Sequence, residues 1–150
     1  MTTKPTSSKQ SNTLTEQKIK EDFSIFLRLV WKSLDLPTPT RAQLAMARYL
    51  QHGGKRIQLQ CFRGLGKSWV TAAFVLWNLF VDRDKKIMVV SASKQRADDF
   101  SIFCQKVIIE VAWLNHLAPK DDDQRWSRVS FDVTGARPAQ SPSVKSVGVT

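Results

Sequence analysis

The residues best suited to chemistry lie together in one octet, Cys61-Phe-Arg-Gly-Leu-Gly-Lys-Ser68. Gly64 and Gly66 can adopt the turn conformations that let several backbone N–H groups converge on one anion. Lys67 adds a positive charge and Ser68 a hydroxyl, at the point where a helix is expected to begin. The positive end of that helix dipole would face the same anion. The octet therefore predicts a site for a phosphate-bearing ligand.

The octet matches the phosphate-loop pattern G-x-x-x-x-G-K-[ST] at Gly66, Lys67 and Ser68, but Cys61 replaces the first glycine. In this pattern the lysine contacts the β- and γ-phosphates of ATP, and the hydroxyl contacts Mg²⁺. Since glycine makes up about 7% of residues, a chance G-K-[ST] is expected in roughly 5–10% of chains of this length. A plain turn followed by an ordinary helix N-terminus therefore stays open as the alternative.

Two elements must position the octet, a strand before it and a helix after it. Ile57, Leu59 and Cys61 alternate with polar residues, which predicts a strand over Arg56–Phe62. Lys67–Phe80 is apolar on nearly all sides, as is typical of a helix buried against a sheet. This order of strand, glycine turn and helix is the context that the phosphate loop requires.

The remaining chain is expected to alternate helices and strands after a polar, disordered tail over residues 1–13. Helices are predicted at Thr13–Leu34, at Thr40–His52 and from Ser93 to Val111. Strands are predicted at Lys86–Ser91, Arg128–Val133 and Val144–Val149. The alternation indicates an α/β fold with a parallel sheet and flanking helices. The continuous apolar run over 86–91 indicates a strand covered on both faces.

Charge and composition narrow the class of partner. The 150 residues carry 23 Lys and Arg against 13 Asp and Glu, a net charge of +10, which favours phosphate-bearing partners. No acidic residue occurs between Leu36 and Val81, the stretch that contains the octet. The longest apolar run is much shorter than the about 20 residues that a membrane-spanning helix needs. Cys61 and Cys104 fit neither a metal knuckle nor a disulfide framework, which favours a reducing intracellular setting.

Three stretches resemble the large terminase subunits of tailed bacteriophages, which are ATP-driven DNA-packaging motors, and in particular the DNA maturase B type of short-tailed phages. They are CFRGLGKS (Cys61–Ser68), VVSASKQRADDFSIF (Val89–Phe103) and SPSVKSVGVT (Ser141–Thr150). The resemblance implies a P-loop NTPase-like fold, with residues 14–150 as the N-terminal, incomplete part of the ATPase domain. In that family the first glycine is often absent and an arginine stands four positions before the lysine, where this chain has Arg63.

The resemblance also implies roles for individual residues. Arg63 and Lys67 would be catalytic, and Ser68 would help to hold Mg²⁺. The residues that would contact ATP are those of the loop, one residue after it and one upstream glutamine. They are Gln43, Arg63, Gly64, Leu65, Gly66, Lys67, Ser68 and Trp69. Gln43 resembles an upstream glutamine that contacts adenine, although it also completes a capping box with Thr40. Trp69 and Trp77, both on the expected helix, are also interpreted as core residues rather than base-stacking platforms.

The function implied is that of an ATPase, with ATP and Mg²⁺ as cofactors, that drives double-stranded DNA into a procapsid. Expected partners are the portal or procapsid, the small terminase subunit and further copies in a ring, in the host cytoplasm and away from membranes. The acidic strand that holds Mg²⁺ and the endonuclease domain are expected beyond residue 150, so the isolated fragment is expected to be inactive. Asp132 is only a weak candidate for that acidic strand. A helicase-like translocase and a basic nucleic-acid-binding module with a coincidental GKS remain as alternatives.

Overall fold

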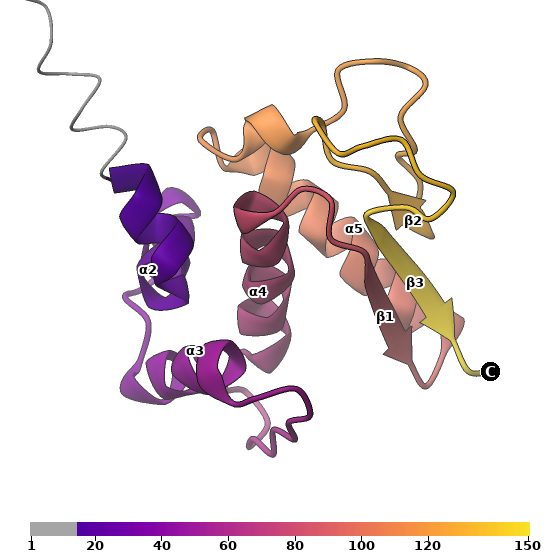
Figure 1. Ribbon diagram of the computed structural model, residues 1–150. Helices are drawn as coiled ribbons and strands as arrows, with labels where there is room; N and C mark the ends of the chain where they lie inside the picture. Colours follow the sequence, from indigo (N-terminus) through magenta and orange to yellow (C-terminus); the bar gives the residue numbers. More distant parts are fainter. Residues whose placement is uncertain (1–14) are drawn as a thin grey trace, which may run out of the picture.

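The computed structural model describes residues 15–150, so the tail expected over residues 1–13 lies outside the described residues. The described helices are α2 (Phe23–Ser33), α3 (Arg41–His52), α4 (Lys67–Val81), α5 (Lys94–Glu110) and a short 3₁₀ turn at Asn115–Leu117, after a helical stretch over 15–21. Figure 1 shows α4 in the middle of the molecule, with α2 and α3 on one side. On the other side α5 packs against both α4 and the sheet.

The sheet is small and mixed. It consists of β1 (Ile87–Ser91), β2 (Ser130–Phe131) and β3 (Val144–Gly148), in the order β1-β3-β2. β1 and β3 run parallel, with Ile87 opposite Val144, whereas β2 runs antiparallel to β3. The α/β class is therefore confirmed, and the expectation of a wholly parallel sheet is wrong.

The strand predicted over Arg128–Val133 is reduced to two residues because the chain turns back within it. Ser127 and Ser130 face each other across a tight turn, where the Ser127 amide donates to the Ser130 carbonyl at 2.9 Å. Trp126 and Phe131 form a bridge on either side of this turn. The first part of the predicted strand thus lies in a turn, which the alternation of apolar and polar residues alone does not reveal.

The strand predicted over Arg56–Phe62 is not formed. This segment runs as an extended chain below α3 and α4, apart from the sheet (Figure 1). Its alternation still describes the packing, since Ile57, Leu59 and Cys61 are half-buried and the two glutamines between them are exposed. Alternation reports which side chains face the protein, but a strand also needs a neighbouring strand edge. The described residues supply no such edge here.

The single helix predicted over Thr13–Leu34 is interrupted at Asp22. This residue has an extended backbone (φ −131°, ψ 108°), and its carboxylate accepts the amide of Ser24 at 2.8 Å, which caps α2. Short polar side chains compete with helical hydrogen bonds in this way. The apolar face continues across the break, so helical spacing alone does not reveal it. The expected start at Thr13 lies outside the described residues.

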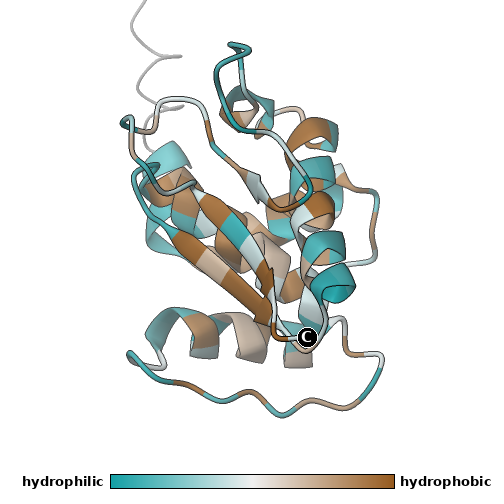
Figure 2. Cartoon of the chain, turned by 90° about the vertical axis from the view of Figure 1, so that its right-hand side faces the viewer, coloured by the Kyte–Doolittle hydropathy of each residue, from teal (hydrophilic) through white to brown (hydrophobic). Residues whose placement is uncertain are grey.

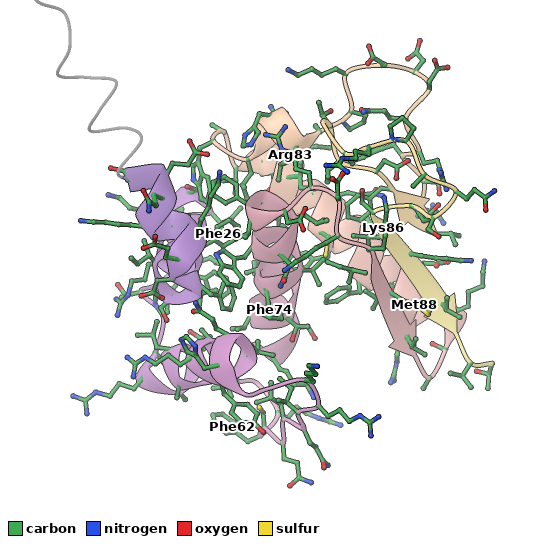
Figure 3. The ribbon with its side chains drawn as sticks, in the orientation of Figure 1. Phe26, Phe62, Phe74, Arg83, Lys86 and Met88 are labelled. Atoms are coloured by element: carbon green, nitrogen blue, oxygen red, sulfur yellow. The ribbon has the colours of Figure 1, made fainter. Side chains whose placement is uncertain are left out.

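The hydrophobic core lies between α2, α4 and α5 and is rich in aromatic rings. Phe26 on α2 and Phe74 on α4 both lie in the layer between the two helices (Figure 3). Phe23 packs edge-on against Phe74 with the ring centroids 5.2 Å apart. Trp77 is buried and donates its indole N–H to the Ile19 carbonyl at 2.9 Å. The interpretation of Trp77 as a core residue is confirmed.

One face of the sheet is bare. α5 packs on the other face, whereas Met88 is 65% exposed and Val90 58% exposed on β1. Figure 2 looks onto β1 and β3 and shows hydrophobic stretches along them with no helix in front. The expectation that residues 86–91 are covered on both faces is therefore wrong for this chain. No helix among the described residues is long and apolar enough to cross a membrane.

Candidate phosphate site

The loop that precedes α4 is shaped by its two glycines. Gly64 has φ +94° and Gly66 has φ +80°, conformations that other L-residues rarely adopt. Between them the Leu65 amide donates to the Phe62 carbonyl at 3.4 Å, which closes a turn. Gly66 is then the N-cap of α4. The chain therefore reverses within four residues and enters a helix of fifteen residues.

The beginning of α4 has free hydrogen-bond donors. Gly66 supplies no side-chain cap, and the first intrahelical bond runs from the Val70 amide to the Gly66 carbonyl at 3.1 Å. Within the described part of the chain, the amides of Lys67, Ser68 and Trp69 find no acceptor. Three unsatisfied donors at the positive end of a long helix favour an anion in front of them.

Gln43 fixes this loop from α3. Its side-chain Oε1 accepts the Thr40 backbone N–H at 3.0 Å, and its backbone N–H donates to the Thr40 hydroxyl at 3.2 Å, so the predicted capping box is present. Its Nε2 also donates to the Leu65 carbonyl at 2.9 Å. A Cβ placed on Gly66 would lie 3.1 Å from the same nitrogen. Gln43 is therefore both a helix cap and a strut for the loop, and contact with adenine stays a prediction.

The charged and hydroxyl side chains of the octet are exposed. Lys67, Ser68 and Arg63 are all exposed, and the described residues offer no carboxylate within ion-pair distance of either cation. Lys67 and Ser68 line an open cavity of about 630 Å³ between α4, the end of β1 and the first turns of α5. Arg63 and Gln43 are not among its lining residues. The structure thus brings the first two residues of α4 together in a cavity, and Arg63 lies outside that cavity.

Trp69 lines the same cavity and is 41% exposed, so the interpretation of Trp69 as a core residue is wrong. Its ring is held edge-on between Trp31 on α2, at a centroid distance of 6.3 Å, and Phe103 on α5, at 4.6 Å. The Trp69 side chain lies at the boundary between α4 and α5, where part of its indole is exposed in the cavity. Its role in binding a nucleotide stays a prediction.

Several side chains outside the octet share this cavity. They are Thr71 on α4, Ser91 at the end of β1, and Arg96, Asp99, Phe100 and Phe103 on α5. Ser91 and Arg96 follow a parallel strand, and ligands in open α/β sheets bind at the carboxyl ends of such strands. From this rule the sequence predicts that the segment 91–96 could touch DNA or support the phosphate loop, with a helix cap at Ser93 as the alternative. Asp99 had no signal, because a single acidic residue on a helix is usually solvated.

Asp132 is committed elsewhere. Its carboxylate pairs with Arg125 at 3.2 Å and accepts the Ser143 amide at 3.0 Å, so it connects the hairpin to the residue before β3. It does not line the cavity beside Lys67. Among the described residues, no cluster of three or more His, Cys, Asp or Glu side chains could hold a metal ion.

Comparison with known proteins shows what this chain is similar to. No family model matches the chain. Over 140 residues, 93% of this chain, the sequence is 50% identical to the terminase large subunit of Enterobacteria phage T3. The chain spans 24% of the length of that protein. The resemblance that the three sequence stretches indicated is confirmed: nearly the whole chain matches part of a phage terminase large subunit, about a quarter of that protein's length.

Proposed function

We propose that this chain is the nucleotide-binding part of a viral DNA-packaging ATPase with a P-loop fold, and that residues 61–68 hold the phosphates of Mg-ATP. The observation that carries the proposal is the loop itself. Two glycines with positive φ precede a helix whose first three amides have no acceptor among residues 15–150, with Lys67 and Ser68 as its first two residues. Backbone donors, a cation and a hydroxyl are the groups that an oligophosphate requires.

The residues fit the ligand in charge as well as in shape. The amides of Lys67, Ser68 and Trp69 point out of the positive end of α4, and the Lys67 ammonium is not neutralised by a described carboxylate. Ser68 offers an exposed hydroxyl as one ligand for Mg²⁺. When bound, Mg²⁺ would supply further positive charge to the β- and γ-phosphate oxygens. Gln43 keeps the turn in place through its hydrogen bond to the Leu65 carbonyl.

In the complete protein, we propose that ATP hydrolysis at this loop drives double-stranded DNA into a procapsid. The portal, the small terminase subunit and further copies in a ring are the partners that this role requires. The similarity to a terminase large subunit supports this role over a general helicase. The acid-free stretch from Leu36 to Val81 supports a phosphate-bearing partner on the same chain.

Competition between nucleotides tests the site in this chain. Because the loop is proposed to hold the β- and γ-phosphates, Mg-ATP and Mg-ADP should bind at least about tenfold more tightly than AMP, the effect of one charge-assisted contact. Isothermal titration with the three nucleotides measures this order. Equal affinity for AMP and ATP would mean that the loop does not contact the β- and γ-phosphates.

Arg63 is proposed to act on the transferred phosphate, since a guanidinium can bridge two phosphate oxygens as charge shifts between them. In the complete subunit, Arg63→Ala should lower the ATPase rate by about 10²-fold, less than the loss of an arginine finger, with a much smaller loss of ATP affinity. Arg56→Ala, an exposed arginine of the same segment, is the matched control. Equal losses of rate and affinity would contradict a role in the reaction itself.

A further inference from the structure

The cavity beside the beginning of α4 combines groups that bind phosphate with groups that do not. Lys67 and Ser68 line it from α4. The rest of its lining includes three aromatic rings: Trp69 of α4, and Phe100 and Phe103 of α5. Small-molecule sites combine apolar and aromatic walls with a few polar groups that fix the orientation of the ligand. Phosphates held by the loop would leave these rings without a partner in the ligand.

The Trp69 ring lines the cavity and is held in one position by its neighbours. The residue is 41% exposed, and its ring makes T-shaped contacts with Trp31 of α2 and Phe103 of α5, at centroid distances of 6.3 and 4.6 Å. Trp31 is itself buried in the core. An aromatic ring that is already fixed can stack on a flat ligand with little further loss of conformational entropy. Trp69 therefore offers a stacking surface inside the cavity.

One side of α5 lies along the same cavity. The α5 residues that line it follow the spacing i, i+3, i+4 and i+7, which places side chains on one side of a helix. They are Arg96, Asp99, Phe100 and Phe103. Arg96 and Asp99 carry opposite charges, so this wall has no net formal charge, whereas α4 contributes Lys67 and the amides of its first turn. The anionic part of a ligand is therefore drawn to α4, and an uncharged aromatic part is left to the rings.

Gln43, the residue that the resemblance assigns to adenine, does not line this cavity. Both polar atoms of its side chain are engaged within the protein, since Oε1 accepts the Thr40 N–H and Nε2 donates to the Leu65 carbonyl. A Cβ on Gly66 would lie 3.1 Å from the same Nε2, so Gln43 packs against the loop. A base at Gln43 would compete for the atoms that hold the loop in place. Stacking on the Trp69 ring requires no hydrogen bond to break.

We propose that this cavity holds the adenine base of ATP, stacked on Trp69, while the phosphates lie at the beginning of α4. The inference rests on the proposed function and adds the position of the base, at Trp69 rather than at Gln43. Trp69 follows Lys67 by two residues in the first turn of α4, so one ligand can contact both. Figure 1 shows the beginning of α4 and the end of β1 at the same end of the molecule, and both line the cavity.

Comparison of Mg-ATP with Mg-tripolyphosphate tests the position of the base, because tripolyphosphate presents the phosphates alone. Isothermal titration of the 150-residue chain gives the ratio of the two dissociation constants, which measures the contribution of the nucleoside. The variants are Trp69→Leu, which keeps an apolar side chain and removes the ring, and Trp69→Phe, which keeps a ring. Trp126→Leu is the control, since Trp126 is half-buried beside Phe131 and does not line this cavity.

Trp69→Leu should reduce the preference for ATP over tripolyphosphate by about tenfold, the effect of one base–aromatic stack. Trp69→Phe should keep the preference within about threefold of the wild type, because a ring is still present. Trp126→Leu and Gln43→Ala should change the preference by less than about twofold, as expected of side chains that do not contact the base. An unchanged preference in Trp69→Leu would overturn the proposal, as would an equal loss in Gln43→Ala or in Trp126→Leu.

Phe100→Leu gives the same comparison from the other helix, and it replaces Trp69→Leu if circular dichroism shows that this variant does not fold. Phe100 is half-buried and lines the cavity from α5. Its substitution should reduce the preference for ATP by about threefold, the effect of one aromatic contact. A preference equal to that of the wild type would contradict a base in this cavity.

Lys67→Ala separates the position of the base from the phosphate site itself. Tripolyphosphate binding that Lys67→Ala does not weaken would contradict the proposed function at the phosphate loop. If Lys67→Ala weakens tripolyphosphate binding while Trp69→Leu leaves the preference for ATP unchanged, the phosphate site stands and only the base lies elsewhere. The two proposals therefore fail by different results.

Discussion

The two flanks of the phosphate loop differ in how they are held. Downstream, α4 buries seven of its fifteen residues and contacts α2, α3 and α5. Upstream, residues 55–62 form no strand, and Phe62 at the end of this segment is 70% exposed (Figure 3). The loop is therefore positioned by the helix that follows it and by Gln43 from α3, rather than by the segment that precedes it.

The two free thiols should show the largest difference between the upstream segment and the packed core. Cys61, upstream, is half-exposed, whereas Cys104 on α5 is buried, and burial raises the pKa of its thiol from 9.0 to about 12. Because alkylation needs the thiolate, Cys104 should react at least about 10³-fold more slowly than an ordinary thiol at pH 8. Mass spectrometry after a timed iodoacetamide pulse should find label on Cys61 and none on Cys104. Equal labelling of both thiols would mean that α5 is not packed as described.

Truncation of an apolar side chain should lower the unfolding free energy more on the downstream flank than on the upstream flank. Leu76 on α4 is fully buried, so Leu76→Ala should cost about 2–5 kcal/mol of unfolding free energy through lost burial and a cavity. Leu59→Ala, in the upstream segment, should cost about 1 kcal/mol or less because its side chain is only half-buried. Urea unfolding monitored by circular dichroism measures both variants. Similar losses would show that the upstream segment is as firmly packed as α4.

The packed flank was predictable from sequence and the open flank was not. Residues 67–80 are apolar on nearly all sides, and the structure turns this run into α4. Thr40 and Gln43 predicted the start of α3, because a capping box depends on four neighbouring residues alone. Ile57, Leu59 and Cys61 predicted their own packing but not the absence of a neighbouring edge, which is a property of distant residues.

The same distinction separates the parts of the candidate site. The sequence identified Lys67 and Ser68 because the glycine turn and helix start are local. The link from Gln43 to the Leu65 carbonyl joins residues far apart in the sequence, and so does the cavity shared with Ser91 and Asp99. Neither could be read from spacing. Asp22, which splits the first predicted helix, was a local signal that the longer apolar periodicity obscured.

Gln43 offers a smaller test of the strut between α3 and the loop. Gln43→Ala removes one side of the capping box and the bond to Leu65, and should lower the unfolding free energy by about 1 kcal/mol. Gln58→Ala, an exposed glutamine of the upstream segment, should change it by less than about 0.5 kcal/mol. Thermal unfolding of the two variants gives the comparison. If Gln43→Ala changed the unfolding free energy as little as Gln58→Ala, the loop would not be held in place by α3.

The central claim is that the downstream flank binds phosphate, and titration of Mg-ATP into paired lysine variants tests it most directly. Lys67 begins α4, and Lys55 is an equally exposed lysine of the upstream flank, so both substitutions to alanine remove one exposed positive charge. Lys67→Ala should weaken Mg-ATP binding by about tenfold or more, and Lys55→Ala by less than about twofold. Unchanged binding in Lys67→Ala, or equal losses in the two variants, would contradict a phosphate site at the start of α4.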